Sequence, residues 1–286
     1  MAEEQHNAQS ACNGVSQYDP AFIQRLLAEQ ERSGKMLIRR DLELTRANER
    51  LRELDQLKTD FVSTATHQMR TPLAGIKWGL GMLLNGDFGA MTSDQELYVR
   101  KAYASTERMI ELLRDMLFAE QVGSGTFPAI ETETDIMMLC QNVVREMHPL
   151  AYSRQVTVAF VHDKDTYPTV KTSPEYVQAI LQNLLENAIK YSHAGGTVTL
   201  NIREEKPQLI ITVSDTGIGI PADQQKHIFE RFFRAENAKK EITDGSGLGL
   251  YIAKQLAEKA HGRIQFESIE GKGTIFIITL PLMYTK

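Results

Sequence analysis

A histidine at position 67 stands among small polar residues rather than apolar ones, and it is the first candidate for chemistry in this chain. With helical spacing it shares one face with Ser63, Arg70 and Thr71, so that face carries two hydroxyls, an imidazole and a guanidinium. Pro72 has no N–H to donate to the carbonyl four residues earlier, so we expect the helix to bend one turn beyond the histidine. An ordinary surface histidine beside a proline would show the same pattern, and the other motifs must decide.

Two amides and a lysine form a second candidate. Asn183, Asn187 and Lys190 are spaced at i, i+4 and i+7, so a helix places them on one face. Amide oxygens are hard ligands that suit Mg²⁺, and a lysine ammonium suits a phosphate. The pattern therefore predicts a site for a metal–nucleotide complex.

Two glycine-rich segments complete the candidates for ligand binding. The predicted strand 209–214 leads into Asp215, Gly217 and Gly219, and the segment 245–249 opens a predicted helix. Glycines let the backbone approach a ligand closely, and a carboxylate at a strand end can accept a hydrogen bond from an exocyclic amine. The free N–H groups at the start of the second segment's helix would hold phosphates. Either segment alone also fits a plain turn, whereas their order and spacing together are more specific.

The elements before the histidine are predicted to be one long helix. Apolar residues recur every seven positions over much of 18–57, with a second apolar position between them, which predicts a coiled coil of two parallel strands running into the histidine helix. A solvated helix lying on its own domain is the alternative. In the coiled-coil register His67 falls outside the apolar seam, which is the line of residues where the two helices meet, and stays accessible. Arg40 and Lys58 interrupt the seam. The seam residues are Leu37, Leu44, Leu51, Lys58 and Ala65 at one position and Ala47, Leu54 and Phe61 at the other.

The histidine helix is predicted to turn back on itself. The turn residues 85–89 stop it, and Thr92 followed by Gln95 predicts a capping box at the start of a second helix that reaches about Gln121. A hairpin over 58–122 cannot cover its own apolar stripe. We therefore expect a homodimer whose two hairpins form a four-helix bundle.

The remainder, 127–286, is predicted to be an α/β sandwich with helices on one face of a mixed sheet. The whole chain is then an α+β multidomain protein. The short segment 123–125 predicts a flexible break before this domain. The expected strands are 156–161, 197–203, 208–214 and 274–280, and the expected helices are 135–145, 174–191 and 247–260.

Composition excludes several classes of function. The 286 residues are 42% apolar and 24% charged, with a net charge of −5 and no cluster of basic residues, so no nucleic-acid partner is expected. Cys12 and Cys140 predict neither a disulfide framework nor a zinc site, which fits a reducing cytoplasm. No apolar run is long enough to span a bilayer. Residues 1–17 are predicted to be a disordered tail.

In this combination the chain resembles the sensor histidine kinases of two-component signalling, whose ATP-binding domain is of the Bergerat type. The resemblance covers roughly residues 58–283. The segment 229–234 is similar to the phenylalanine box of that family's mobile ATP lid. The other four boxes are the phospho-acceptor box around His67, the asparagine box 183–191, the first glycine box 215–221 and the second glycine box 245–249.

This resemblance implies an activity. His67 would be phosphorylated from ATP, Asn187 together with Asn183 would hold Mg²⁺, and the phosphoryl group would pass to an aspartate of a response regulator receiver domain. In related ATPases a glutamate at the position of Asn183 activates water, so the asparagine favours protein phosphorylation over hydrolysis.

The same resemblance implies contacts for the nucleotide. Lys190 and Arg234 would contact phosphates, Tyr191 would pack near the base, and Asp215 would recognise the adenine amine. The implied nucleotide-binding set is Asn183, Asn187, Lys190, Tyr191, Asp215, Gly217, Gly219, Arg234, Gly245, Gly247, Leu248 and Gly249.

Two positions depart from the family's pattern. Gln68 stands where the family commonly has an acid that takes the proton of the imidazole; its carbonyl can still hold the ring N–H but cannot act as a base. Ser173 stands before Pro174 where an aspartate is common, and we expect it to cap the helix equally well.

Thr71 occupies the place of the hydroxyl that, in members of this family, positions water for phosphatase activity. An ATP-binding scaffold without kinase activity and a Bergerat-fold ATPase are the competing hypotheses.

Overall fold

The computed structural model describes residues 20–127, 129–242 and 245–282. The predicted disordered tail lies outside these ranges. The chain divides into two compact units, 1–58 and 59–286. Among the described helices, none combines the length and apolar character needed to cross a membrane.

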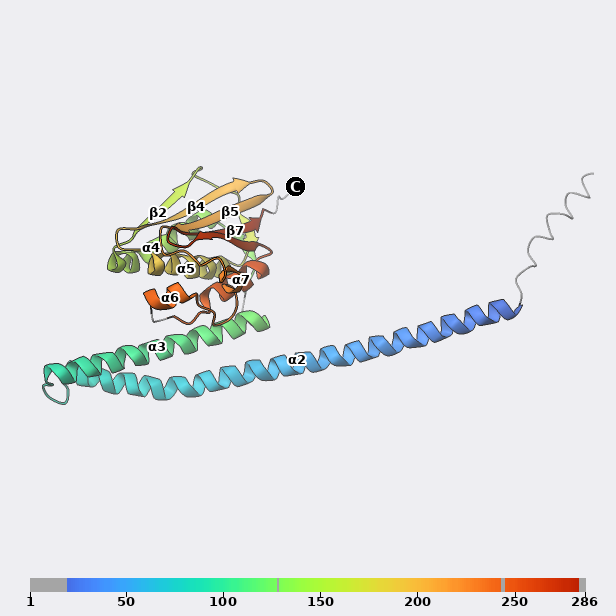
Figure 1. Cartoon of the computed structure of the whole chain (residues 1–286), viewed down its shortest axis with the longest axis horizontal. Coiled ribbons are helices and arrows are strands. Elements are labelled where there is room, and N and C mark those ends of the chain that lie inside the picture. Colours follow the sequence, from blue (N-terminus) through green and yellow to red (C-terminus); the bar gives the residue numbers. More distant parts are fainter. Residues whose placement is uncertain (1–19, 128, 243–244, 283–286) are drawn as a thin grey trace, which may run out of the picture. The chain divides into compact units, whose positions relative to one another are not determined.

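The long helix α2 (Pro20–Asn85) begins in the first unit and ends in the second (Figure 1). It continues through Pro72 without a break in its helical assignment. In the first unit the heptad leucines are uncovered, because Leu37, Leu44 and Leu51 are each more than 60% exposed. A helix whose apolar stripe is exposed gains little stability from packing within one chain.

The second unit begins with a helical hairpin made by the end of α2 and by α3 (Ser93–Ser124). Glycines with positive φ close the turn: Gly86 has φ +83° and Gly89 has φ +105°. The predicted capping box is present, since the side chain of Thr92 accepts from the backbone of Gln95 and the Gln95 side chain accepts from the backbone of Thr92. An ion pair of 2.8 Å between Lys77 Nζ and Glu107 Oε1 joins the two helices.

A five-stranded mixed sheet forms the second part of this unit, in the order β2-β4-β5-β7-β6. The strands β2 and β4 are parallel, and the other pairs are antiparallel. Three-residue strands pair in a separate small sheet. The bounds are β1 (Thr132–Thr134), β2 (Thr157–His162), β3 (Val170–Thr172), β4 (Thr197–Glu205), β5 (Gln208–Asp215), β6 (Arg263–Ile269) and β7 (Gly273–Pro281).

Three helices cover one face of this sheet (Figure 1). They are α4 (Ile136–Arg154), α5 (Pro174–Tyr191) and α7 (Gly249–Lys259). A short helix η2 (Gln225–His227) and α6 (Glu236–Glu241) lie between β5 and α7 in the chain. The architecture is the predicted α+β sandwich with helices on one side.

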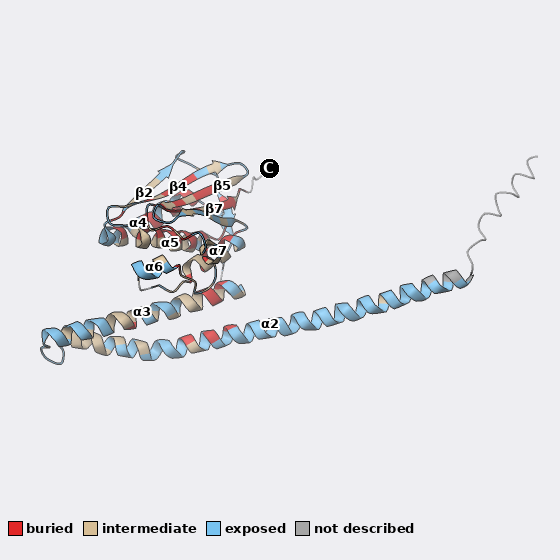
Figure 2. Cartoon of the chain, viewed as in Figure 1, coloured by how far each residue is buried: buried red, intermediate tan, exposed pale blue. Residues whose placement is uncertain are grey.

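The core lies between the sheet and these helices (Figure 2). Alternate residues of β4 face it, and Val198, Leu200 and Ile202 are fully buried, while α5 contributes Leu181 and Leu185. Burying each such aliphatic side chain stabilises the fold by about 1.5–3 kcal/mol. The alternation on β4 and the helical stripe on α5 therefore fix which face of α5 is left for the site.

The junction between hairpin and sandwich differs from the predicted flexible break. The helix α3 continues to Ser124 and ends on Gly125, whose φ is +78°. Ala119 and Val122 are buried in the core of the sandwich. The last turn of α3 is therefore packed into the sandwich, because its apolar side chains have a core to enter that the local sequence does not reveal.

Two further local predictions need correction. Ser173 occupies the position before α5 but makes no capping bond; its hydroxyl donates to the carboxylate of Glu175 instead. The helix α4 runs past the predicted end near 145 to Arg154, because Ala151 is buried and the left-handed Gln155 donates its N–H to the carbonyl of Ala151.

Candidate nucleotide site

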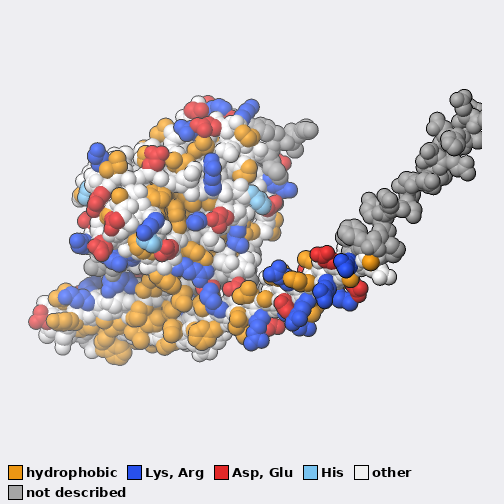
Figure 3. Space-filling view, turned by 45° about the vertical axis from the view of Figure 1, so that its right-hand side comes forward, with side chains coloured by type: hydrophobic (Ala, Val, Ile, Leu, Met, Phe, Trp, Pro, Cys, Tyr) orange, Lys and Arg blue, Asp and Glu red, His pale blue; other side chains and the backbone are white. Residues whose placement is uncertain are grey.

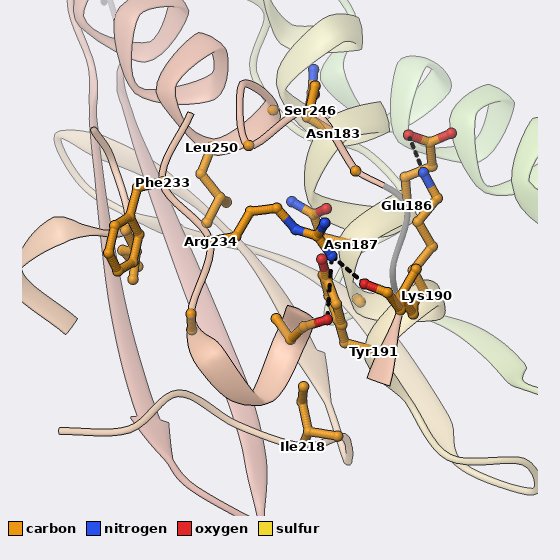
Figure 4. Close-up of a pocket in the computed structure, with 18 of the residues that line it drawn as sticks. Asn183, Glu186, Asn187, Lys190, Tyr191, Ile218, Phe233, Arg234, Ser246 and Leu250 are labelled. Carbon is orange, nitrogen blue, oxygen red and sulfur yellow. Dashed lines mark hydrogen bonds and ion pairs between the residues drawn. The ribbon is translucent and has the colours of Figure 1, made fainter. Parts of the chain in front are cut away.

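A cavity of about 590 Å³ opens between α5, the two glycine boxes and the lid, which is the segment between Pro221 and Gly247 (Figure 4). It also borders α3 between Ser105 and Asp115. Ten of the twelve residues in the predicted nucleotide set line it, although they come from parts of the chain up to 66 positions apart. They are Asn183, Asn187, Lys190, Tyr191, Asp215, Gly219, Arg234, Gly245, Gly247 and Gly249.

The helix α5 supplies the polar wall of the cavity. The Nδ2 atom of Asn183 donates to the carbonyl of Ala179 at 2.8 Å, which leaves its Oδ1 atom facing the start of α7. Lys190 forms an ion pair of 3.5 Å with Glu186, and both side chains are more than a third exposed. An exposed i, i+4 pair of this kind is weak, so Lys190 can exchange Glu186 for a phosphate at small cost.

Asp215 is held at the end of β5 by two backbone groups. Its Oδ1 atom accepts the N–H of Gly217 at 2.9 Å and the N–H of Thr274 at 3.2 Å. Burial raises the pKa of the Asp215 carboxyl, and these two hydrogen bonds offset part of the rise. Among the described residues Oδ2 has no hydrogen-bond partner, and it remains available to accept from a ligand.

The first glycine box owes its sequence to crowding of the backbone. A Cβ atom on Gly217 would lie 2.2 Å from the carbonyl oxygen of Tyr191, and one on Gly219 would lie 2.1 Å from that of Ile269. Gly217 does not line the cavity. It lets the backbone turn tightly after Asp215, so that the Gly217 N–H can donate to the Asp215 carboxylate. The first glycine box thus holds the Asp215 carboxylate in position.

The second glycine box places α7 against α5. Gly247 has φ +68°, and a Cβ atom there would lie 2.7 Å from the backbone of Phe232. Leu248 does not line the cavity but is 1% exposed in the core, directly before the first residue of α7. It therefore anchors the start of α7 in the core rather than forming part of the cavity wall.

Arg234 enters the cavity from the lid. Its Nη2 atom donates to the carbonyls of Ala238 and Ile242 at the end of α6 (Figure 4). Asn237 links the same helix to the first glycine box by donating to the carbonyl of Gly219 at 2.9 Å. The predicted phosphate contact is thus engaged with lid carbonyls in this conformation.

Several lining residues were not predicted. Apolar side chains form one wall, and Thr274 positions Asp215 across the sheet. Three of the apolar residues lie within predicted boxes without having been assigned to the site: Ile218 and Ile220 in the first glycine box, and Phe233 in the phenylalanine box. The others have only a strand, helix or loop pattern that any core would show. The apolar residues are Ile218, Ile220, Ile228, Phe233, Leu250 and Phe276.

The predicted phosphotransfer residues lie elsewhere. His67, Gln68 and Thr71 are exposed on α2, and none of them lines the cavity. Exposure leaves the imidazole accessible to a reactant brought to it. Phosphoryl transfer requires the reacting atoms to come within about 3–3.5 Å, so a catalytic encounter needs the cavity and an acceptor histidine to meet.

The donor set suits a cation that arrives together with a ligand. The part of the chain that the structure describes contains no cluster of three His, Cys, Asp or Glu side chains that could hold a metal ion alone. The site offers instead the Oδ1 atom of Asn183, which faces the start of α7, with the amide of Asn187 beside it. Neutral amide ligands suit Mg²⁺ that arrives with the phosphates of a nucleotide.

Comparison with known families identifies the class to which both parts belong. Residues 172–283 match the family described as "Histidine kinase-, DNA gyrase B-, and HSP90-like ATPase". Residues 57–125 match the "His Kinase A (phospho-acceptor) domain".

Similar proteins share this combination. The histidine protein kinase SaeS of Staphylococcus aureus (strain MW2) is 32% identical over 246 residues, covering 83% of this chain and 68% of SaeS. The sensor histidine kinase WalK of Bacillus subtilis (strain 168) is 32% identical over 231 residues, covering 80% of this chain and 37% of WalK. The circadian input-output histidine kinase CikA of Synechococcus elongatus is 31% identical over 225 residues, covering 78% of this chain and 30% of CikA. The chain spans about a third of the length of the last two relatives.

Solved structures agree. The crystal structure of full-length ShkA in complex with AMPPNP has a TM-score of 0.64 and 27% identity, covering 79% of this chain and 46% of that one. The histidine kinase AdeS of Acinetobacter baumannii has a TM-score of 0.54 and 20% identity over 76% of this chain and 98% of AdeS, a likeness of fold alone. This chain belongs to the histidine kinase family.

Proposed function

We propose that the chain is an ATP-dependent autokinase that phosphorylates His67 and donates the phosphoryl group to an aspartate of a response regulator. One observation carries this proposal: a single cavity gathers the amides of α5, a buried carboxylate and both glycine boxes, in a chain that also presents an exposed histidine on a helix. Full-length ShkA, which has a related fold, was crystallised in complex with the ATP analogue AMPPNP, and this supports an adenine nucleotide as ligand here.

In the proposed mechanism each wall of the cavity has one task. Oδ2 of Asp215 accepts a hydrogen bond from the exocyclic amine of adenine, while Oδ1 stays fixed by the backbone. Tyr191 packs beside the base, and the N–H groups at the start of α7 face the phosphates. Lys190 and Arg234 neutralise phosphate charge once they leave Glu186 and the carbonyls of α6.

Asn183 and Asn187 would hold Mg²⁺, which when bound supplies neutralisation of charge on the transferring phosphate. The geometry of Asn183 fits this task, because its amide nitrogen donates to the carbonyl of Ala179 and its amide oxygen faces the start of α7. The cavity would thus orient the nucleotide by its base at one end and by its phosphates at the other.

The transfer step needs a neutral imidazole. One ring nitrogen of His67 attacks the γ-phosphorus with its lone pair, a nitrogen–phosphorus bond forms, and the bond to the bridging oxygen of ADP breaks. The other ring nitrogen must then lose its proton. Gln68 can hold this N–H through its carbonyl and fix the tautomer, but the proton passes to water because an amide is not a base.

We further propose three functional segments and a homodimer. They are a signalling coiled coil at 18–57, the dimerisation and phosphotransfer hairpin at 58–122, and a catalytic domain at 127–286. Hydrophobic side chains gather along the hairpin (Figure 3), and Phe61, Trp78 and Tyr98 are each at least 70% exposed in one chain. A second copy would cover them in a four-helix bundle. Equilibrium sedimentation at micromolar concentration should give the mass of two chains, and a monomeric mass would refute this assembly.

Thr71 lies one turn after His67 on the same face, which supports a phosphatase activity toward the phosphorylated regulator. We place the work of this chain in the cytoplasm, where ATP and response regulators occur together. These finer functions rest on the kinase proposal and are tested separately below.

The central experiment is labelling with γ-labelled ATP and Mg²⁺. We expect acid-labile, alkali-stable label on the chain, as a phosphohistidine gives, and none on a His67→Gln variant. Release of phosphate without labelled protein would favour a Bergerat-fold ATPase. Nucleotide binding without either product would favour a scaffold and overturn the proposal.

A further inference from the structure

The end of α3 is joined to the lid by an ion pair that no sequence motif predicted. Glu120 on α3 is only 6% exposed, and its Oε1 atom accepts a hydrogen bond from Nη1 of Arg231 at 2.5 Å. The Nη2 atom of Arg231 donates to the hydroxyl of Tyr251 at 2.7 Å, and the guanidinium carbon lies 4.6 Å from the centre of the Tyr251 ring. Arg231, which belongs to the lid, thus links α3 to α7.

A glycine in α3 makes room for this arginine. A Cβ atom on Gly123 would lie 2.7 Å from Nη2 of Arg231 and 3.3 Å from the hydroxyl of Tyr251. Gly123 is the next-to-last residue of α3, which ends at Ser124. A larger side chain there would meet the guanidinium, so the glycine leaves the space that Arg231 occupies.

The contact continues from Arg231 to the nucleotide cavity. The next residue, Phe232, has φ +63°, a conformation sparsely populated by a bulky side chain, and its N–H donates to the carbonyl of Gly247 at 3.0 Å. Gly247 lines the cavity, and so does Phe233 one residue further on. Such backbone conformations persist when the surroundings determine them strongly, and they occur at switch regions. The chain of contacts runs without a gap from α3 to the phosphate-binding loop.

We infer that Glu120, Arg231 and Tyr251 form a clamp that positions the catalytic domain on the hairpin, so that lid and α3 move as one body during phosphoryl transfer. The clamp residues touch neither nucleotide nor acceptor and act through the lid and α3. This inference rests on the proposed kinase function. In-line transfer tolerates little misplacement, since an error of about 1 Å costs about 10²-fold in rate.

Two variants disturb the clamp while leaving the core in place. In Gly123→Ala the added methyl group displaces the guanidinium, although alanine favours helix over glycine. In Arg231→Lys the charge opposite Glu120 remains, but an ammonium cannot bridge Tyr251 and stack flat on its ring together. Arg203→Lys, in an exposed ion pair with Glu205 on β4, is the matched control.

For each variant the kcat of autophosphorylation at saturating ATP, the affinity for AMPPNP and the thermal midpoint are measured. We expect both clamp variants to lose about tenfold or more in kcat, with the affinity for AMPPNP within about twofold of the parent. The thermal midpoint of Gly123→Ala should be no lower than that of the parent. If Gly123 had only a structural role, activity would be lost together with thermal stability and not without it. Arg203→Lys should behave as the parent. An unchanged kcat in Gly123→Ala, or a parallel loss of nucleotide affinity, would overturn the clamp.

A second measurement does not depend on kinase activity. Hydrogen exchange of α3 is compared with and without AMPPNP in the parent and in Gly123→Ala. We expect nucleotide to slow exchange in the last turns of α3 in the parent and to have no effect there in the variant. The same response in both proteins would refute the clamp even if the chain labels His67. Absence of label in the parent with the expected exchange pattern would refute the kinase proposal and leave the clamp standing.

Discussion

Asn183 on α5 and Gly249 at the start of α7 lie so close that a methyl group on Gly249 would come within 2.7 Å of the Asn183 Oδ1 atom. The same methyl group would lie 3.7 Å from the Nδ2 atom of Asn187. The first residue of α7 therefore crowds Asn183 and is in ordinary contact distance of Asn187. It has to be a glycine if Asn183, one of the two amides that we propose as magnesium ligands, is to keep its orientation.

Gly249→Ala should weaken binding of AMPPNP with Mg²⁺ at least about tenfold, or ~1.4 kcal/mol, because Asn183 must turn away. Without Mg²⁺ the loss should be smaller, since the displaced oxygen then has no cation to bind. Isothermal titration with and without the ion measures both. Gly34→Ala, at a position with no atom within 4 Å of the new methyl group, is the control. Equal losses with and without Mg²⁺ would contradict the proposed ligand role.

Asp215→Asn should abolish the preference for adenine while sparing the fold. The amide oxygen can keep the N–H bonds of Gly217 and Thr274, but the amide nitrogen then meets the exocyclic amine as a second donor. Affinity for AMPPNP should fall by about 10²-fold or more, since an unpaired buried donor is costly. A guanine nucleotide, which presents an acceptor there, should gain relative to adenine. A variant that still prefers adenine as the parent does would remove Asp215 from base recognition.

The same carboxyl predicts a pH dependence. Its pKa is raised chiefly by burial, and only the ionised form presents two acceptor oxygens. Affinity for an adenine nucleotide should therefore fall on acidification, starting at a higher pH than for an exposed aspartate. The free protein should show the opposite trend, because protonation of a group with a raised folded pKa stabilises the fold, and this contribution is lost as pH rises through that pKa. Titrations of the parent against Asp215→Asn check both, and identical pH profiles would contradict the assignment.

Local patterns were sufficient for the elements that carry motifs. The i, i+4, i+7 spacing on α5 and the two glycine boxes predicted eight of the ten side chains and backbone positions that meet in one cavity, and the family resemblance added Tyr191 and Arg234. The strand β6 was missed, although Ile264 and Phe266 alternate with exposed polar residues there. The strands β1 and β3 are only three residues long, which is too short for any period to be visible.

Pairing across the sheet could not be predicted. Thr274 holds Asp215 only because β5 and β7 are neighbours, a fact set by register and not by either local sequence. The same holds for Arg231, whose partners lie 111 and 20 positions away in the chain. Such contacts become visible only when the strands and helices are in place.

Gln68→Glu should raise the rate of autophosphorylation, by up to about 10²-fold, because a carboxylate can take the proton that the amide cannot. The initial rate of labelling with γ-labelled ATP measures this, and His67→Gln in either background should give no label. Gln68→Ala is the informative comparison. If glutamate leaves the rate unchanged while alanine destroys it, the position only orients the imidazole, and proton removal is not limiting.

Thr71→Ala should impair dephosphorylation of the phosphorylated regulator and spare autophosphorylation. The hydroxyl lies on the exposed face of α2 with His67, where it can hold a water against a phosphoaspartate. The decay of labelled regulator in the presence of the chain and ADP measures the first activity, and labelling of His67 measures the second. Ser63→Ala, which removes a hydroxyl one turn before the histidine, is the matched control. An equal loss of both activities in Thr71→Ala would show a general disturbance of the helix.

The turn between β6 and β7 looks like a place where the chain could lengthen freely, since it lies on the surface between two antiparallel strands. Yet Gly273, with φ +118°, leads directly into the N–H that holds Asp215, and a Cβ atom on it would lie 2.0 Å from the Asp215 carbonyl oxygen. We expect an epitope tag or a reporter inserted there to disturb the Asp215 carboxylate, and with it the base selection that we propose for this residue. The turn between β4 and β5, at Lys206, contributes no residue to the cavity and can accept such an insertion. Two hairpins of one sheet thus differ in how far their lengths can vary between relatives.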